Sequence, residues 1–338
     1  VMYFERFPYI DNSGEGRFKK KTEIDLDKEG IALVQVRSEG EIPLLGVKRR
    51  VEDGFTKLVF PEGVLLDWFT YPELRVIEEK GMGKVERILE AFEWRFYWNP
   101  FREFIEAMYR KRKELENDKV KSTLYKLLMN SLYGKFGEYK GGEKIIIEDG
   151  KVVKREPSFS MKHRYYHSLV YASYITAYGR IWLWRLMNSQ NTKRFYYCDT
   201  DSVFTSHDLS HRVGKYLGDL KLEGEVKPME ATFIRSKFYI FGDLVRLKGF
   251  TLKIAGEDMK KLILNGAREI PQEKFIKPLE ALRRKVSPLA YEVVRKTFSL
   301  SPDYKRVYKE YLDREMLFRD YTYSEPRLVR EGEFYAYS

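Results

Sequence analysis

Two aspartates separated by one residue stand within an aromatic and apolar run, FYYCDTDSVF, from Phe195 to Phe204. Because alternate residues of a strand point to the same side, Asp199 and Asp201 are predicted to share one side of the chain, at a tip where two strands turn back. Two converging carboxylates repel each other unless a cation or a shared proton lies between them. Mg²⁺ suits such a pair, since it takes a few carboxylates and completes its shell with water and substrate phosphates.

Two divalent ions about 3.5–4 Å apart can activate an attacking hydroxyl and stabilise a leaving pyrophosphate, which is the chemistry of nucleotide polymerisation. The pair therefore predicts two Mg²⁺ ions, with Mn²⁺ as an alternative. Two other interpretations of the same residues remain open at this point. One is an exposed acidic turn, and the other is the general acid and nucleophile of a glycosidase.

A second segment with chemical potential is the expected helix VKSTLYKLLMNSLYG, which begins at Val120. At about 100° per residue it places polar side chains on one face, namely Lys119, Ser122, Lys126, Asn130 and Tyr133. The apolar residues fall opposite: Val120, Leu124, Leu127, Leu128 and Leu132. The polar face offers a cation for a triphosphate, an amide, and a ring able to lie on a base. Gly134 is expected to end this helix, where a larger residue would crowd whatever lies over Tyr133.

The elements that must position these residues follow from periodicity. Residues 31–36 and 42–47 read as strands, so the first hundred residues are expected to be mainly sheet and loop. Helices are predicted from Pro100 to about residue 113, over residues 120–133 and over residues 169–187.

Between the last two helices, the segment from Glu143 to Arg155 contains two β-branched runs joined by Asp149-Gly150, which predicts a hairpin with a tight turn. Residues 238–241 are expected to form another strand, and the basic chain after Glu257 is expected to be helical.

Composition limits the partners. A net charge of +11 and a pI near 9.3 favour a polyanion, because Lys and Arg release counterions from a phosphate backbone. The 43% of hydrophobic residues form no apolar run of about 18 residues or more, so no membrane partner is expected. A single cysteine, Cys198, excludes an internal disulfide and fits a reducing compartment. The opening residues show no secretion signal, and a cytoplasmic location, in a bacterial or archaeal host or a virus-infected cell, is expected.

Aromatic and basic residues interleave in FEWRFYW, from Phe92 to Trp98. Such interleaving suits base stacking beside phosphate contacts. It suits an aromatic core with a wet rim equally well.

Three motifs together resemble the family B DNA polymerases. KLLMNSLYG, from Lys126 to Gly134, matches their Lys-x-x-x-Asn-Ser-x-Tyr-Gly motif, and YCDTDS, from Tyr197 to Ser202, matches their Tyr-x-Asp-Thr-Asp-Ser motif. KFY, from Lys237 to Tyr239, resembles their Lys-x-Tyr motif. With LKIAG, from Leu252 to Gly256, the chain is most similar to the protein-primed branch of phages, viruses and linear plasmids.

The resemblance implies a DNA-directed DNA polymerase that binds a primer-template and deoxynucleoside triphosphates, and it implies roles for individual residues. Asp199 and Asp201 would be the catalytic, metal-binding carboxylates, and Thr200 and Ser202 would lie beside the DNA. Residues implied in nucleotide binding are Lys126, Asn130, Tyr133 and Gly134, with Arg110, Arg112 and Lys113 one helix earlier. Lys237 and Tyr239 would contact the primer strand or its minor groove.

The fold that the resemblance implies is α+β, a right-hand polymerase with an antiparallel-sheet palm, helical fingers and a mainly helical thumb. Residues 1–99 would be a palm-associated region that includes an insertion over residues 41–97, which in this branch docks a priming protein. The fingers would span 100–137, a hairpin insertion 138–165, the palm 166–256 and the thumb 257–338. The basic stretches LRRK (282–285) and YKRVYK (304–309) would hold duplex product.

The family's upstream motif Asp-x-x-Ser-Leu-Tyr-Pro, which carries a further catalytic carboxylate, is absent from this sequence. VMYFERFP resembles the residues that follow it. We therefore expect a split polymerase or a fragment, with an N-terminal polypeptide that supplies the first catalytic Asp, and an exonuclease domain or a priming protein as further partners. The alternative is an inactive, polymerase-like DNA-binding subunit.

Three weaker features have ordinary explanations. Asp25 and Asp27 are expected to lie in a solvated acidic loop rather than to replace the missing carboxylate. The i,i+4 pairs His163 with His167 and His207 with His211 have zinc-ligand spacing but no neighbouring Glu or Cys, so ordinary, partly exposed histidines are favoured.

Overall fold

The computed structural model describes residues 1–10, 18–50, 56–137, 142–148, 151–158, 167–189, 194–227, 231–250, 254–276, 281, 284–287, 291–298, 300 and 334–337. Internal contacts divide the chain into two compact units. Among the described residues, unit 1 contains Val1–Val47 and Pro61–Trp184, and unit 2 contains the remainder. No helix in the described part of the chain is long and apolar enough to cross a membrane.

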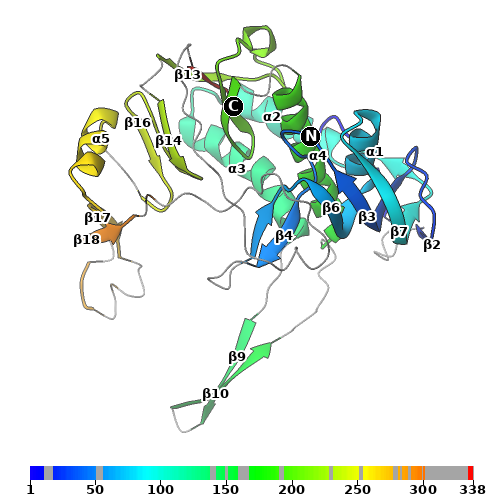
Figure 1. Ribbon diagram of the computed structural model, residues 1–338. Helices are drawn as coiled ribbons and strands as arrows, with labels where there is room; N and C mark the ends of the chain where they lie inside the picture. Colours follow the sequence, from blue (N-terminus) through cyan, green and yellow to red (C-terminus); the bar gives the residue numbers. More distant parts are fainter. Residues whose placement is uncertain are drawn as a thin grey trace. The chain divides into compact units, whose positions relative to one another are not determined.

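Unit 1 is built on a four-stranded antiparallel sheet with the order β2-β7-β3-β6. The strands are β2 (Phe18–Lys21), β3 (Glu29–Ser38), β6 (Gly63–Thr70) and β7 (Gly83–Trp94). The strand predicted over residues 31–36 is confirmed as part of β3, where Ala32, Val34 and Val36 are fully buried, as alternation requires. Helix α1 (Tyr71–Glu79) packs on this sheet, as Figure 1 shows.

The expectation of mainly sheet and loop in the first hundred residues did not include α1. The sequence nevertheless contains a signal for the start of this helix, because Thr70-Tyr-Pro-Glu73 combines a capping box with a proline in the first turn. The Glu73 carboxylate accepts hydrogen bonds from the Thr70 backbone N–H at 3.2 Å and from its hydroxyl at 2.8 Å. The other oxygen of Glu73 accepts from the Arg180 guanidinium at 2.7 Å, which ties α1 to α4 (Leu169–Asn188).

The strand predicted over residues 42–47 is wrong. Leu44 and Leu45 are buried, so the apolar run was a correct sign of burial, but they lie in an irregular segment. Pro43 cannot donate to a ladder, which works against a strand here. The strand starts only at Val47, with β4 (Val47–Arg50) beside β5 (Thr56–Val59).

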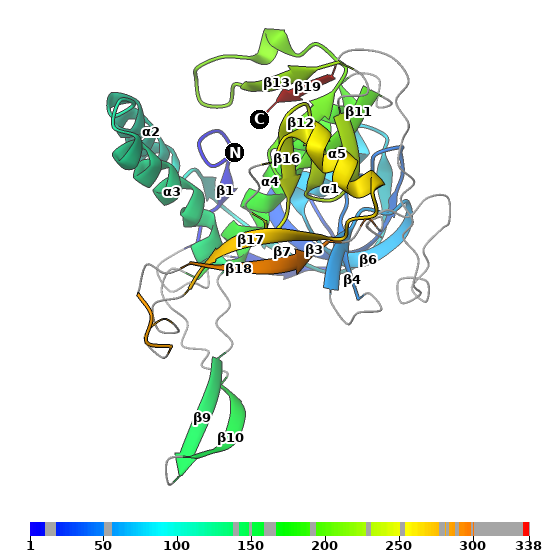
Figure 2. The same ribbon diagram turned by 90° about the vertical axis from the view of Figure 1, so that its left-hand side faces the viewer.

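The predicted helices after Pro100 are confirmed as α2 (Arg102–Glu114), α3 (Lys119–Phe136) and α4. Helices α2 and α3 lie side by side, as Figure 2 shows. The predicted hairpin is confirmed as the antiparallel pair β9 (Gly142–Glu148) and β10 (Lys151–Ser158), whose expected turn at Asp149-Gly150 lies outside the described residues. A short ribbon pairs β1 (Phe7–Pro8) with β8 (Tyr97–Trp98).

Among the described residues, unit 2 contains a four-stranded and a three-stranded antiparallel sheet. The first has the order β11-β12-β19-β13, with β11 (Phe195–Asp199), β12 (Ser202–Thr205), β13 (Leu222–Val226) and β19 (Phe334–Tyr337). The 3-10 turn η2 (Ser210–Arg212) lies between β12 and β13 in the chain. The second sheet joins β14 (Ala231–Arg235), β15 (Phe238–Phe241) and β16 (Leu244–Leu247), which confirms the strand predicted over residues 238–241.

Among the described residues, the helical interpretation of the chain after Glu257 holds for α5 (Gly256–Leu264) and for Ala281. Two strands follow, β17 (Glu269–Phe275) and β18 (Tyr291–Thr297), which pair antiparallel. Val293, Val294 and Thr297 are β-branched and favour this conformation. The core formed by Phe238, Met259 and Phe298 joins α5 to the second sheet of unit 2. Most of the expected thumb tail, including YKRVYK, lies outside the described residues.

Candidate functional site

The acidic pair lies at the tip of the β11-β12 hairpin, where the sequence predicts it. Asp199 is the last residue of β11 and is paired with Ser202, the first residue of β12. Thr200 and Asp201 form the two-residue connection, and the Asp201 N–H donates to the Asp199 carbonyl oxygen at 2.7 Å. This tight reversal brings the two carboxylate-bearing residues together on an exposed turn.

The turn is strained at Thr200, whose φ of 58° lies in the left-handed region. A β-branched residue rarely adopts this conformation, which costs on the order of 1–3 kcal/mol and persists only where the surroundings impose it. Two hydroxyl groups contribute to that fixation. Thr200 Oγ1 donates to Asp199 Oδ1 at 3.0 Å, and Ser202 Oγ donates to the Asp199 carbonyl oxygen at 3.1 Å.

Lys237 lies directly against the hairpin tip. Its Nζ donates to both carboxylate oxygens of Asp199, at 2.9 Å each, from the turn between β14 and β15. Lys237 has a φ of 57°, so this turn is also held in the left-handed region. Lys237, which was predicted to contact the primer strand, therefore forms an ion pair with Asp199 in this structure.

Tyr197, which the sequence did not mark as a site residue, positions Lys237. The Tyr197 hydroxyl oxygen accepts a hydrogen bond from the Lys237 backbone N–H at 2.8 Å, and its ring stacks on Phe233 at 5.6 Å. Burial raises the pKa of Tyr197 to about 12, so the hydroxyl stays neutral at physiological pH. The signal was present, because this tyrosine is the first residue of the Tyr-x-Asp-Thr-Asp-Ser motif.

Tyr239 lies in the aromatic layer beneath the tip. Its ring contacts Tyr197 at 5.4 Å and Phe204 at 4.9 Å, and burial raises its pKa. The layer packs around the buried rings of Phe204 and Phe241. These apolar contacts explain why two charged residues follow an apolar run. The apolar residues of the run pack under the hairpin, and the charged residues lie only at its tip.

The groups at this tip fit a hard divalent cation. Asp199 and Asp201 supply carboxylate oxygens, and the Lys237 ammonium shows that Asp199 already holds a positive charge with both oxygens. The described residues contain no cluster of three or more His, Cys, Asp or Glu side chains that could hold a metal.

Asp25 behaves as the expected solvated loop residue. It pairs with Lys28 at 2.8 Å and accepts from the Asp27 N–H at 3.2 Å, and the hydrogen bond from Lys28 lowers the pKa of Asp25. Of the histidines, His207 was expected to be partly exposed but is buried, with its ring 5.5 Å from that of Phe195, and His163 lies outside the described residues.

On α3, Lys126, Asn130 and Tyr133 follow one another at helical spacing and are exposed, as predicted. The apolar face is not where the sequence placed it. Leu127 is 59% exposed, whereas Met129 is 8% exposed and is the buried residue of the helix. Apolar residues lie on two sides of α3, and their spacing in the sequence does not show which side packs against the rest of the protein.

Gly134 does not end α3, which continues to Phe136. Among the described residues, a Cβ at Gly134 would meet no atom within 4 Å, so the expected crowding is not seen there. On α2, Arg110 and Lys113 are exposed near the C-terminal end of the helix, and the Lys113 ammonium lies 5.9 Å from the centre of the Tyr109 ring.

Comparison with known proteins agrees with this arrangement. The family model for DNA polymerases of type B, organellar and viral, matches residues 1–208. A DNA polymerase of Acidianus bottle-shaped virus is 33% identical over 158 residues, which is 45% of this chain and 20% of that protein. A probable DNA polymerase of Neurospora intermedia is 25% identical over 298 residues, which is 77% of this chain and 28% of that protein.

Among solved structures, Phi29 DNA polymerase in complex with primer-template DNA and incoming nucleotides is similar, with a TM-score of 0.54 and 19% sequence identity. The similarity covers 89% of this chain and 55% of that one. An orthorhombic crystal form of Phi29 DNA polymerase gives a TM-score of 0.56. The fold is therefore that of a right-hand polymerase, α+β with antiparallel sheets, and the chain spans only a part of the length of these proteins.

Proposed function

The chain belongs to the type B DNA polymerases of organelles and viruses, and from that premise we propose that it adds deoxynucleotides to a primer 3′ end by phosphoryl transfer at Asp199 and Asp201. The observation that carries the proposal is the strained hairpin tip, where Asp199 meets the Lys237 ammonium placed by Tyr197 and Asp201 follows in the same turn. An ordinary acidic surface turn needs neither the left-handed backbone at Thr200 nor the layer of aromatic rings packed under the hairpin.

In the proposed reaction, the primer 3′-oxygen bonds to the α-phosphorus of the incoming nucleotide, the bond from that phosphorus to the bridging oxygen breaks, and pyrophosphate leaves. The hydroxyl proton passes to solvent. Two divalent ions, when bound, stabilise the attacking oxygen and the departing pyrophosphate. Asp199 and Asp201 would hold these ions at the hairpin tip, and Lys237, which pairs with Asp199 in this structure, would contact the primer strand.

The incoming nucleotide is proposed to bind α3. The Lys126 ammonium would pair with the triphosphate, Asn130 would add polar contacts, and the Tyr133 ring would lie near the nascent base pair. Arg110 and Lys113 of α2 would reach the phosphates. In this assignment α2 and α3 belong to the fingers (100–137), residues 166–256 to the palm and residues 257–338 to the thumb.

We further propose that another polypeptide segment supplies the carboxylate of the missing Asp-x-x-Ser-Leu-Tyr-Pro motif. The regions that match this chain cover 20% of the viral relative and 28% of the fungal one, which leaves room in those proteins for that motif. A priming protein is a further proposed partner, since the resemblance is to the protein-primed branch.

The decisive experiment is primer extension with Mg²⁺, in the presence of the upstream polypeptide, by the wild-type chain and by Asp199→Asn. We expect the variant to lose at least about 1000-fold in rate, since it removes a ligand of the proposed ions, while its affinity for primer-template stays within about threefold of wild type. Asp243→Asn, an exposed aspartate in the β15-β16 turn, is the matched control and should extend normally.

If Asp199→Asn still extended primers, the hairpin tip would have no part in the reaction. DNA binding by the wild type without extension under any divalent metal would favour the alternative, a polymerase-like subunit that only binds DNA.

A further inference from the structure

Helix α3 exposes a row of large apolar side chains that the proposed reaction does not use. Val120 is 81% exposed, Leu124 55%, Leu127 59% and Leu128 44%. We call these four residues the α3 stripe. At about 100° per residue, the buried Met129 points to roughly the opposite side of the helix, so the stripe faces away from the packed side of α3. An apolar row exposed to this extent marks an interaction surface.

The spacing of these residues fits a second helix. Val120, Leu124, Leu127 and Ser131 follow one another at intervals of four, three and four residues, which is the seam along which two helices pack as a coiled coil. Ser131 is small and exposed, so a partner could approach closely at that end of the seam. Because the side chains of a strand repeat every two residues, this interval favours a helix over an extended segment as the partner.

Charge narrows the choice of partner. From Lys119 to Phe136, α3 contains four lysines and no Asp or Glu. Lys121 and Lys135 are exposed and stand seven residues before and after Leu128, so the three side chains form one row along an edge of the seam. In paired helices, charged residues in this row set partner choice and orientation.

The lysine row excludes some partners and suits others. Two copies of α3, each with lysines and without acidic residues, would repel each other, which disfavours a second copy of this chain as the occupant. A helix with Glu or Asp beside its own apolar seam has complementary charge. Lys121 is available for such a partner, since its pair with Asp118 at 3.0 Å is exposed and such pairs are weak.

We propose that the α3 stripe docks an amphipathic helix of another polypeptide, with apolar residues at its seam and acidic residues beside them. The docked part would be about three turns long, to match the seam from Val120 to Ser131. The face of α3 proposed for the nucleotide, with Lys126 and Asn130, is a different side of the helix. Docking therefore does not rest on the proposed polymerase function.

The test is the affinity of the 338-residue chain for a labelled synthetic peptide of three heptads, measured by fluorescence anisotropy. The peptide has Leu at positions a and d and Glu at e and g, and its glutamates keep it from pairing with itself. Leu124→Gln and Leu127→Gln should each weaken binding at least about tenfold, the size expected for a leucine that is no longer buried on docking.

These substitutions keep the free chain intact, because both leucines are exposed and Gln is a good helix former. Unfolding followed by circular dichroism should be the same for the variants and the wild type. Leu264→Gln is the matched control, since Leu264 is an exposed leucine at the end of α5 in unit 2, and it should bind the peptide like wild type.

A second peptide, with Lys in place of every Glu, isolates the contribution of charge. The wild-type chain should bind it at least about threefold more weakly than the Glu peptide, and the double variant Lys121→Glu, Lys135→Glu should reverse this preference. Lys248→Glu, at an exposed lysine of unit 2, should leave the preference unchanged. Hydrogen exchange should slow in α3 and not in α5 when the Glu peptide binds.

Binding of the Glu peptide by both leucine variants within twofold of wild type would overturn the proposal. So would equal affinity of the wild type for the two peptides, or a dimer of the wild-type chain that Leu124→Gln abolishes, since a second copy would then occupy the stripe. If the wild type fails to extend primers while the leucine variants lose the Glu peptide, the polymerase function fails and the docking site stands.

Discussion

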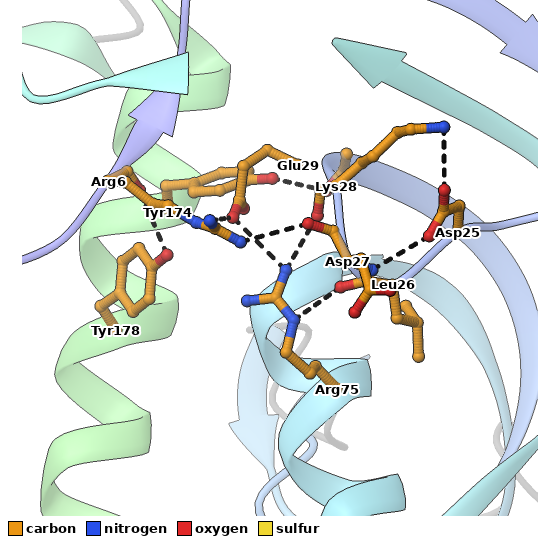
Figure 3. Close-up of polar contacts among 10 residues, drawn as sticks. Arg6, Asp25, Leu26, Asp27, Lys28, Glu29, Arg75, Tyr174 and Tyr178 are labelled. Carbon is orange, nitrogen blue, oxygen red and sulfur yellow. Dashed lines mark hydrogen bonds and ion pairs between the residues drawn. The ribbon is translucent and has the colours of Figure 1, made fainter. Parts of the chain in front are cut away.

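At the scale of single residues, two carboxylates of this chain, Asp199 and Glu29, are each paired with cationic side chains. Asp199 meets the Lys237 ammonium with both oxygens on the surface of unit 2, and the buried Glu29 of unit 1 meets Arg6 and Arg75 (Figure 3). The first pair is partly exposed, and on the proposed function a metal ion replaces the ammonium there. The second is buried on the carboxylate side, where burial raises the pKa of Glu29, and it serves to hold a guanidinium in place.

Exchange of the cation on Asp199 leads to a prediction for Lys237→Met. Removing the ammonium frees both oxygens of Asp199, so Mn²⁺ binding should tighten by about two- to fivefold, the size expected for one partly exposed ion pair. Electron paramagnetic resonance of Mn²⁺ measures this without any reaction. Lys248→Met, an exposed lysine of the same unit, is the control. Weaker Mn²⁺ binding by Lys237→Met would contradict the idea that the ammonium and the metal ion compete.

Lys126 provides a second residue-scale prediction. In the assembled polymerase, Lys126→Ala should raise the KM for deoxynucleotides by at least about tenfold, because a charge-assisted contact to a phosphate contributes about 1.5–3 kcal/mol. The measurement is primer extension at varied nucleotide concentration. Lys121→Ala on the same helix is the matched control, since Lys121 pairs with Asp118 at 3.0 Å. An unchanged nucleotide dependence would remove Lys126 from the site.

At the scale of elements, α1 shows how one side chain can both start a helix and fasten it. Glu73 closes the capping box with Thr70 and accepts two hydrogen bonds from Arg180 of α4, at 2.7 and 3.1 Å. It is 2% exposed, so its charge depends on these partners. Both the start of α1 and its contact with α4 therefore depend on Glu73.

Glu73→Ala should lower the free energy of unfolding by about 3 kcal/mol, because it removes the cap and leaves the Arg180 guanidinium without its carboxylate. Urea unfolding followed by circular dichroism measures the change. Glu79→Ala, at the exposed C-terminal end of α1, should change stability by less than about 0.5 kcal/mol. Equal effects of the two substitutions would show that Glu73 does not fasten α1.

At the scale of the whole molecule, the chain has the fold of the corresponding part of a right-hand polymerase but is shorter than the proteins it resembles. The similarity covers 55% of the Phi29 DNA polymerase chain, 20% of the viral relative and 28% of the fungal relative. The described residues offer two carboxylates at the hairpin tip, and the family motif with a further one is not in the sequence. On the proposed function, another segment supplies this carboxylate, and activity depends on that segment.

Addition of a polypeptide that carries the Asp-x-x-Ser-Leu-Tyr-Pro motif should convert this chain from inactive to active in primer extension with Mg²⁺. The same polypeptide with its aspartate changed to Asn is the control and should restore no synthesis. Extension by this chain alone would mean that an internal carboxylate completes the site, with Asp25 and Asp27 as the first residues to test.

The sequence by itself determined the local features of this protein. The apolar run before Asp199 predicts a strand, the two-residue spacing predicts a tight reversal, and helical periodicity predicts α2, α3 and α4. Such features depend on neighbours within a few residues, and they could be derived correctly because the chemistry of a turn or of a helical turn is contained in its own residues. The capping box of α1 belongs to the same class and could have been predicted.

Only the tertiary structure decided which distant groups meet. Lys237 lies 38 positions from Asp199 in sequence, β19 pairs with β12 across more than a hundred residues, and Met129 rather than Leu127 is buried on α3. The pairing of Arg6 with Glu29 is of the same kind. These outcomes depend on which surfaces bury the most apolar area together and on which buried charges find partners, and a local pattern holds no information on either.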